Sequence, residues 1–151
     1  MIGSFFVIAG KIKRKFKILF KDEDDKILDL GSGKKPYYHN SIKGNIVCFD
    51  LIDSENVHVR GHAEHLPFKN NSFDKVVSVN SFYYFKNPKV VSKDIARVLK
   101  KKGKLVLVVP FFYPIHDVPE DKFRFTEYGL RSVFEDEFNV EKIETIGGIF
   151  N

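Results

Sequence analysis

Apolar positions along the chain follow two different spacings. Residues 2–20 carry apolar side chains at helical intervals, and most of the basic side chains lie off that stripe, which predicts an amphipathic helix. Further along, short apolar runs have the length of strands. The predicted strands are Lys26–Leu30, Asn45–Asp50, Val57–Arg60, Lys75–Val79, Lys104–Pro110 and Asn139–Ile146.

Two further helices are predicted among the later strands. Asn87 and Pro88 form a favourable helix start, because Asn caps the first turn and Pro fits the first helical position, and Gly103 marks the end. Thr126 begins the other helix. Strands that alternate with helices or connecting loops predict an α/β domain with a Rossmann-like, mostly parallel sheet and helices on both faces. Ligands of such sheets bind at the carboxyl ends of the strands.

Composition agrees with one folded domain. The chain has 151 residues, of which 43% are hydrophobic, and its sixteen Phe can fill a core, which excludes a disordered chain. We expect residues 1–25 to form the basic helix and an acidic link, and residues 26–151 to form the domain. The single cysteine, Cys48, excludes an internal disulfide and fits a reducing compartment such as the cytoplasm.

Charge and hydropathy limit the partners. No apolar run reaches membrane-spanning length, and the first charges follow the apolar residues, unlike a signal peptide. The net charge of +5 attracts anions without specificity. The helix over residues 2–20 either packs on the domain or makes peripheral contact with an anionic membrane, and the pattern is compatible with both.

A glycine turn and an acid suggest a nucleotide-type cofactor. Residues Asp29–Gly33 run from a strand into a Gly-x-Gly turn, where the missing side chains let backbone approach a ligand. Asp50 ends the next strand and can accept hydrogen bonds from ribose hydroxyls. A dinucleotide site needs a third glycine and a helix for the pyrophosphate, but Pro36 and the short connection leave little room for them. The pattern favours an adenosine-type cofactor without pyrophosphate.

Four segments resemble the class I S-adenosylmethionine-dependent methyltransferases, in the group called methyltransferase type 11. The segments are Ile27–Gly33, Val47–Asp50, Gly61–Asp74 and Ile95–Leu105. The third is the most specific, because it resembles the family pattern G-D-A-x-x-L-P-F followed by S-F-D. The resemblance implies S-adenosylmethionine as cofactor.

The resemblance also implies which residues contact that cofactor. They are Asp29, Gly31, Ser32, Gly33, Asp50, Leu51, His62, Ala63 and Asn80. Asp29 would orient the glycine turn and the methionyl ammonium, and Asp50 would hold the ribose. Asn80 would lie near the transferred methyl group.

Two departures from the family pattern matter. His62 stands where the family carries an acid, so that a neutral imidazole would have to accept from the adenine amino group, a contact that protonation weakens. The six predicted strands also leave out the usual antiparallel seventh strand. That strand is absent, the chain is truncated, or another chain covers the gap, and an unpaired edge favours a homodimer.

An aromatic loop after the fifth predicted strand offers candidates for catalysis. Residues Pro110–Thr126 resemble a run found in a subset of these enzymes, some of them associated with surface polysaccharides, which implies a small-molecule or glycan acceptor. The candidates are His116, Asp117 and Tyr113. His116 would be the base for a hydroxyl acceptor, oriented by Asp117 or Asp121, or it would cap a turn while Asp121 and Arg124 pair to hold the loop.

Other interpretations stay open. The substituted His62 and the missing strand also suit a non-catalytic subunit that binds the cofactor. Amino methylation of nucleic acid is less favoured, because the segment Asn80–Tyr83 lacks the two prolines of that motif and no nucleic-acid module is evident. His58, His62 and His65 are close in sequence, but they fall on a strand and an irregular turn with no cysteine nearby, so we expect no bound metal there.

Overall fold

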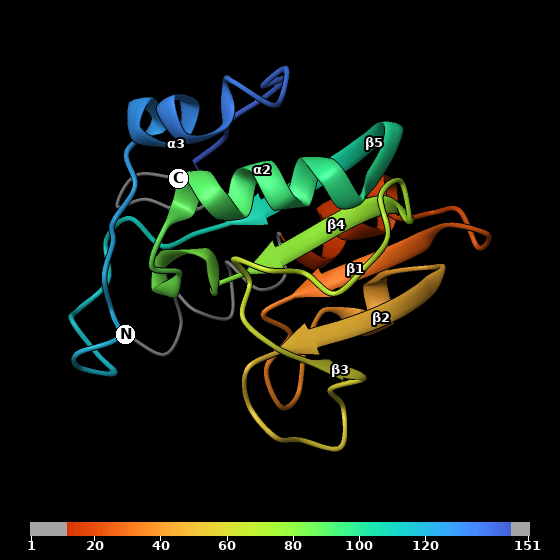
Figure 1. Cartoon of the computed structure of the whole chain (residues 1–151), viewed down its shortest axis with the longest axis horizontal. Coiled ribbons are helices and arrows are strands. Elements are labelled where there is room, and N and C mark those ends of the chain that lie inside the picture. The colour runs from red at the N-terminus through yellow and green to blue at the C-terminus, as the bar shows by residue number, and fades with distance from the viewer. Residues whose placement is uncertain (1–11, 146–151) are drawn as a thin grey trace.

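A computed structural model describes residues 12–145 of the chain, and the core of this part is a five-stranded sheet (Figure 1). The strands lie in the order β3-β2-β1-β4-β5, and every neighbouring pair is parallel. Their bounds are β1 Lys26–Leu30, β2 Asn45–Asp50, β3 Val59–Arg60, β4 Phe73–Val79 and β5 Leu99–Val108. The predicted Rossmann-like α/β architecture is confirmed.

Helices cover both faces of the sheet (Figure 1). One face carries α2 (Pro88–Val98) and α3 (Glu127–Phe134), and the other carries the leading helix, which is helical at residues 12–19. The Thr126 hydroxyl accepts from the Gly129 N–H at 3.0 Å, which satisfies one free donor of the first turn, as predicted. Pro88 begins α2 as predicted, but the predicted capping hydrogen bond is wrong, because the Asn87 side chain makes none. Two short 3-10 turns, η1 (His39–Ser41) and η2 (Phe82–Tyr84), follow β1 and β4.

The strands divide the core into two clusters through the alternation of their side chains. Leu28 and Leu30 of β1 pack toward α2, whereas Ile27 packs toward the leading helix with Phe16 and Phe20. All five side chains are completely or almost completely buried. Each contributes about 1.5–3 kcal/mol of burial free energy, so the leading helix is held on the domain mainly by its apolar stripe. Packing on the domain, one of the two predicted roles of this helix, is what the described part shows.

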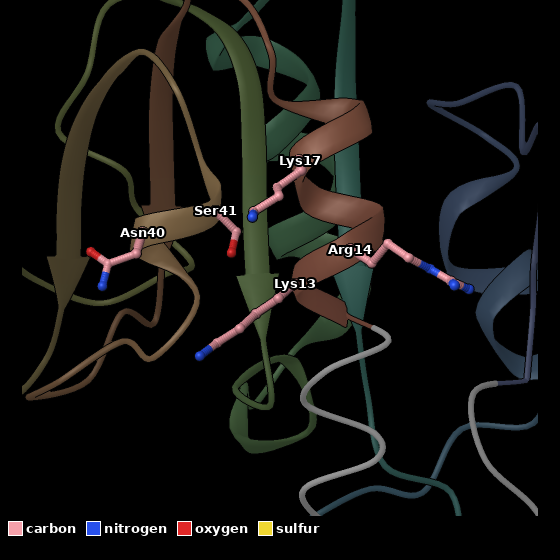
Figure 2. A pocket seen from close by; sticks show the side chains of 5 residues that line it. All are labelled: Lys13, Arg14, Lys17, Asn40 and Ser41. Carbon is pink, nitrogen blue, oxygen red and sulfur yellow. The ribbon is translucent and has the colours of Figure 1, made fainter.

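The polar side of the leading helix borders a basic cavity of about 410 Å³ (Figure 2). Its lining residues are Lys13, Arg14, Lys17, Asn40 and Ser41. The two lysines point toward the η1 segment, and Arg14 points to the other side of the helix. No helix in the described part of the chain is long and apolar enough to cross a membrane.

Several predicted boundaries are wrong, since β4 begins at Phe73 and not at Lys75, and β5 spans Leu99–Val108 and not Lys104–Pro110. Helix α2 ends at Val98 and not at Gly103, because Leu99 already pairs with Phe73 and begins β5. Gly103 lies in the irregular part of that strand, where a Cβ atom would come within 2.9 Å of the Lys100 carbonyl oxygen. The third strand is also shorter than predicted, since only Val59–Arg60 pair with β2.

The predicted strand Asn139–Ile146 does not form over residues 139–145, and Ile146 lies outside the described residues. The segment still passes close to the sheet, because Val140 packs on the core and Glu144 pairs with Lys15 of the leading helix. Glu141 lies 4.0 Å from Lys104 of β5. Side-chain contacts replace the expected backbone ladder. Within residues 12–145, β5 therefore has no outer neighbour strand and no antiparallel seventh strand is present.

Candidate active site

The glycine turn after β1 needs its two glycines for different reasons. Gly31 and Gly33 have φ values of +74° and +68°, in the left-handed region that favours glycine. A Cβ atom on Gly31 would lie 2.3 Å from the Cβ of Ser81, whereas a Cβ atom on Gly33 would meet nothing within 4 Å. Close packing therefore requires Gly31, and Gly33 leaves open space above the turn. Ser32 between them is buried, with its hydroxyl next to the Cys48 thiol.

Asp50 connects this turn to the end of β2. One of its carboxylate oxygens accepts from the Gly33 N–H at 2.8 Å, and the other accepts from the Ile52 N–H at 3.1 Å. Each oxygen keeps a further lone pair for a ligand hydroxyl. The open space at Gly33 beside a half-buried carboxylate fits the ribose of an adenosine-type cofactor. Leu51 follows with 52% of its surface exposed, where an adenine ring could cover it.

Asp29 is enclosed beneath the turn. The Tyr38 hydroxyl lies 2.8 and 2.9 Å from its two carboxylate oxygens, and the Nε2 atom of His39 lies 2.6 Å from one of them. Burial raises the pKa of Asp29, and the hydrogen bonds from His39 and Tyr38 oppose that shift. The structure thus shows Asp29 organising the segment after the turn. Sequence reasoning missed Tyr38 and His39, because no spacing rule connects them to Asp29.

The segment after β3 is held by the salt bridge between Asp94 and Arg97, whose nearest oxygen and nitrogen atoms lie 2.6 Å apart. Ala63 is buried in the core, while His62 is exposed. The Leu66 N–H donates to the Asp94 carboxylate at 2.6 Å, and Arg97 donates to the Leu66 carbonyl oxygen at 2.9 Å. Both side chains come from α2, so this helix fixes the path of the loop.

The end of β4 lies directly beside the glycine turn. Asn80 is exposed with a φ of +53°, and its N–H donates to the Val108 carbonyl oxygen at 2.8 Å. The Ser81 hydroxyl donates to the Leu30 carbonyl oxygen at 2.9 Å. These contacts place Asn80 at the carboxyl edge of the sheet, next to the strand that leads into the turn.

The three neighbouring histidines do not converge. The Nδ1 atom of His58 accepts from the Cys48 N–H at 2.9 Å, which fixes its strand segment to β2. His62 and His65 are exposed on the following turn. Among the described residues, their ring nitrogens are not part of a cluster of ligand atoms that could hold a metal ion.

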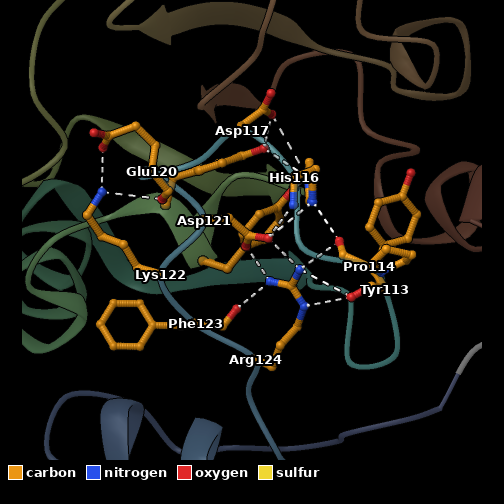
Figure 3. Close-up of polar contacts among 11 residues, drawn as sticks. Tyr113, Pro114, His116, Asp117, Glu120, Asp121, Lys122, Phe123 and Arg124 are labelled. Atoms are coloured by element: carbon orange, nitrogen blue, oxygen red, sulfur yellow. Dashed lines mark hydrogen bonds and ion pairs between the residues drawn. The ribbon is translucent and has the colours of Figure 1, made fainter.

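The aromatic loop after β5 contacts turn η2, which follows β4, and Figure 3 shows the polar contacts within the loop. The Nε2 atom of His116 lies 3.1 Å from the Tyr83 hydroxyl and 3.0 Å from the Tyr84 hydroxyl. Tyr84 donates its single proton to Asp117 at 2.6 Å. Of the two tyrosines, only Tyr83 therefore has a proton that it can donate to Nε2. Sequence reasoning missed both tyrosines, which the chain separates from His116 by more than thirty positions.

The hydrogen-bond network assigns the tautomer of His116. Its Nδ1 atom lies 3.0 Å from the Pro114 carbonyl oxygen, which can only accept, so Nδ1 carries the proton in the neutral ring. The Asp121 carboxylate lies 3.2 Å from Nδ1 and also accepts from the His116 N–H at 3.1 Å. Nε2 is left as an acceptor with a fixed direction, which is the arrangement a general base requires.

Arg124 holds this arrangement together (Figure 3). Its guanidinium forms a bidentate salt bridge with the Asp121 carboxylate, in which one nitrogen to oxygen distance is 2.7 Å. It also donates to the carbonyl oxygens of Tyr113 and Pro114. Hydrogen bonding from Arg124 lowers the pKa of Asp121 to about 2, so this carboxylate is ionised beside His116 at neutral pH. The Tyr113 ring contributes packing, with its centroid 4.9 Å from that of His116.

Comparison with known proteins identifies the fold and the motifs. A family model described as a methyltransferase domain, of type 11, matches residues 28–107. The chain belongs to this family. Its members are class I S-adenosylmethionine-dependent methyltransferases, as the four segments of the sequence implied. The match covers the glycine turn, Asp50, the loop after β3 and most of β5, while the aromatic loop lies beyond it.

Individual relatives are distant. An uncharacterized protein of Methanocaldococcus jannaschii is 29% identical over 110 residues, covering 68% of this chain and 48% of its own length. A demethylmenaquinone methyltransferase of Thermotoga maritima is 27% identical over 110 residues, covering 64% and 48%. The chain therefore spans about half the length of these curated relatives. A solved Bacillus halodurans structure assigned to the methyltransferases superimposes with a TM-score of 0.70 at 21% identity, covering 83% of this chain and 67% of that one, and it shares the fold.

Proposed function

We propose that this chain transfers a methyl group from S-adenosylmethionine to a small-molecule or glycan-type acceptor that carries a hydroxyl group. The observation that carries the proposal is His116, whose Nδ1 proton is fixed by Pro114 and Asp121 and whose Nε2 is left to accept. A base of this kind suits an acceptor that must lose a proton. Family membership supports the choice of cofactor.

The residues around the glycine turn would hold the cofactor. Asp50 would accept from the ribose hydroxyls with its remaining lone pairs, and Gly33 would leave the space that the ligand fills. Asp29 would act mainly through the backbone it organises, because its carboxylate is fully buried. When bound, the cofactor supplies a methyl group on a sulfonium that already leaves readily. The protein therefore has to align and desolvate the reactants more than activate the leaving group.

The aromatic loop would supply acceptor binding and proton transfer. The acceptor hydroxyl would give its proton to His116 Nε2 as its oxygen takes the methyl group that the cofactor would supply, with S-adenosylhomocysteine as the leaving group. The resulting imidazolium is stabilised by ionised Asp121 at 3.2 Å, with Asp117 4.0 Å from Nε2. For this step the acceptor displaces the Tyr83 hydroxyl from its hydrogen bond with Nε2.

A non-catalytic subunit that binds the cofactor is the second candidate. Exposed His62 in place of the family acid and the free outer edge of β5 within residues 12–145 favour it. The same edge supports a homodimer as a proposal. Peripheral contact with an anionic surface is a further proposal for the leading helix, supported by Arg14 and Lys17, which form no ion pair within the described part. Nucleic-acid methylation has no comparable support.

Cofactor binding is the first experiment. Titration calorimetry with S-adenosylmethionine and S-adenosylhomocysteine is expected to give saturable one-to-one binding, and no binding at high micromolar cofactor would overturn both candidates. A panel of hydroxylated small molecules and sugars then separates them. The enzyme reading requires turnover that falls strongly in His116→Ala with cofactor affinity unchanged, while the matched exposed variant His65→Ala stays at the wild-type rate. Binding without turnover across the panel favours the non-catalytic subunit.

A further inference from the structure

A second cluster of polar side chains lies beneath the glycine turn, away from the aromatic loop. Asp29, His39 and Cys48 each offer one ligand atom, and these atoms all lie within 4.8 Å of one another. Asp29 and Cys48 are register partners on β1 and β2, so their side chains leave the same face of the sheet. Turn η1 brings the Nε2 atom of His39 to 2.6 Å from Asp29. Three elements thus direct a carboxylate, an imidazole and a thiol to one point.

Burial makes this cluster different from a surface group of acids. Asp29 and Cys48 are 0% and 3% exposed, whereas the His39 side chain is 25% exposed. Ser32 also lies beside the cluster, because its buried hydroxyl is close enough to the Cys48 thiol to act on it. A fourth polar group therefore stands next to the thiol of the three-residue cluster.

We propose that Asp29, His39 and Cys48 bind a divalent cation of the zinc type. Thiolate, imidazole and carboxylate are the ligands that zinc takes, and a water molecule or the Ser32 oxygen would complete a tetrahedral shell. On binding, the Cys48 thiol releases its proton to solvent and the sulfur bonds the metal, while the neutral imidazole and the carboxylate bind through lone pairs. The cation enters past His39, the one ligand with exposed surface.

The geometry requires a small movement. Two ligand atoms on a tetrahedral zinc ion lie about 3.3 Å apart, given metal to ligand distances of about 2.0–2.1 Å. The His39 ring therefore moves away from Asp29 by roughly half an ångström or more relative to the present 2.6 Å contact. Its partly exposed position on a three-residue turn allows this shift without disturbing β1 or β2.

Occupancy of this site would affect the cofactor, and this consequence alone rests on the proposed function. A cation on Asp29 would replace its 2.6 Å contact with His39 and so alter the segment that Asp29 organises beside the proposed cofactor site. Metal and S-adenosylmethionine are then expected to weaken each other's binding, by the same factor in both directions. The site would make methyl transfer sensitive to free zinc.

Cobalt(II) is the probe for the site itself. The whole chain, purified without metal, is titrated with Co²⁺ and followed by absorption spectroscopy. We expect one equivalent to produce a near-ultraviolet thiolate-to-cobalt charge-transfer band that Zn²⁺ abolishes by displacement. Cys48→Ser, which removes the single cysteine, is expected to lose the band. His39→Gln is expected to bind roughly tenfold or more weakly, and exposed His65→Ala is the matched control.

Each outcome decides the proposal. A wild-type chain that gives no thiolate band, or a band whose titration is unchanged in His39→Gln, would overturn it. Far-ultraviolet circular dichroism and thermal unfolding of each variant show that a lost signal is not lost folding, and His39→Asn replaces a variant that fails this check. If cobalt binds through Cys48 but S-adenosylmethionine does not bind at any metal concentration, the metal site stands and the proposed function fails.

Discussion

Gly31 and Ser81 are packed so closely that a Cβ atom on Gly31 would lie 2.3 Å from the Cβ of Ser81. The Ser81 hydroxyl also donates to the carbonyl oxygen of Leu30, the last residue of β1. Two residues after Ser81, the Tyr83 hydroxyl lies 3.1 Å from the Nε2 atom of His116. The glycine turn is thereby connected through the end of β4 to the aromatic loop, so the proposed cofactor and acceptor sites are parts of one packed unit.

The two glycines of the turn should respond differently to alanine. Gly31→Ala combines overpacking, at about 1–3 kcal/mol, with a left-handed backbone, at about 1–2 kcal/mol, so it should lower the free energy of unfolding by roughly 2–5 kcal/mol. Gly33→Ala carries only the backbone cost, because nothing lies within 4 Å of the new methyl group. It should remain folded and lose cofactor affinity. Urea unfolding and calorimetry test both, and equal destabilisation would contradict the distinct roles.

Asp50 should matter more for ligand affinity than for folding. Asp50→Ala removes a charged acceptor that would hold the ribose, worth roughly 1.5–3 kcal/mol, which corresponds to an increase in Kd of about ten- to a hundredfold for S-adenosylhomocysteine. Calorimetry measures the change. The matched control is Asp53→Asn, a nearby acid whose side chain is 91% exposed, and its Kd should equal that of the wild type. Unchanged affinity in Asp50→Ala would refute the ribose contact.

The sequence was sufficient for features that depend on local pattern. The strands β1 and β2 have the predicted bounds, and the side-chain alternation of a parallel sheet follows from their apolar runs. The sequence was insufficient where tertiary contacts decide whether a segment forms a helix, a strand or neither. Leu99 leaves the helix to pair with Phe73, and Glu144 is held by Lys15 while its segment does not join the sheet. Neither outcome can be predicted from the residues next to Leu99 or Glu144 in the sequence.

The same limit applies to the candidate site. Asp50, Gly33 and Asn80 lie at the carboxyl edge, where strand ends alone would place them. The contact between Tyr83 and His116 joins two segments that are far apart in the sequence. It forms because the loop after β5 returns to turn η2, and the sequence does not predict that path. His62 is exposed on the turn after β3, where we propose that its ring meets the adenine amino group.

Arg97 should control the order of the loop after β3. It donates to the carbonyl oxygens of Leu66 at 2.9 Å and Phe68 at 2.7 Å, hydrogen bonds to a charged group that contribute roughly 1.5–3 kcal/mol each at most. Arg97→Gln should speed amide hydrogen exchange over residues 62–71 and leave β1 protected. Arg131→Gln is the control, because Arg131 makes only an exposed pair on α3. Loss of protection in both variants would point to a global effect.

The pair of Asp121 and Arg124 should give the fold a defined sensitivity to acid. Arg124 lowers the pKa of Asp121 from 3.8 to about 2, so the folded state binds this proton less readily than the unfolded state. The stabilisation is therefore fully present above about pH 4 and is lost as pH falls toward 2. Arg124→Gln should reduce the free energy of unfolding at pH 7, and the difference from wild type should shrink between pH 4 and 2.

The acid sensitivity of the wild type alone does not identify the Asp121 pair, because Glu144 also has its pKa lowered to about 2 by pairing with Lys142 and Lys15. The difference in free energy of unfolding between wild type and Arg124→Gln does identify it. Urea unfolding of wild type, Arg124→Gln and the control Lys142→Gln at several pH values separates the two pairs. Lys142→Gln should leave the acid dependence that belongs to Asp121 intact. The effects of the two substitutions should add when they are combined, since the two pairs have different partners. A stability difference for Arg124→Gln that stays constant down to pH 2 would mean that Arg124 acts through its contacts with the Tyr113 and Pro114 carbonyl oxygens, which do not titrate, and not through the charge of Asp121.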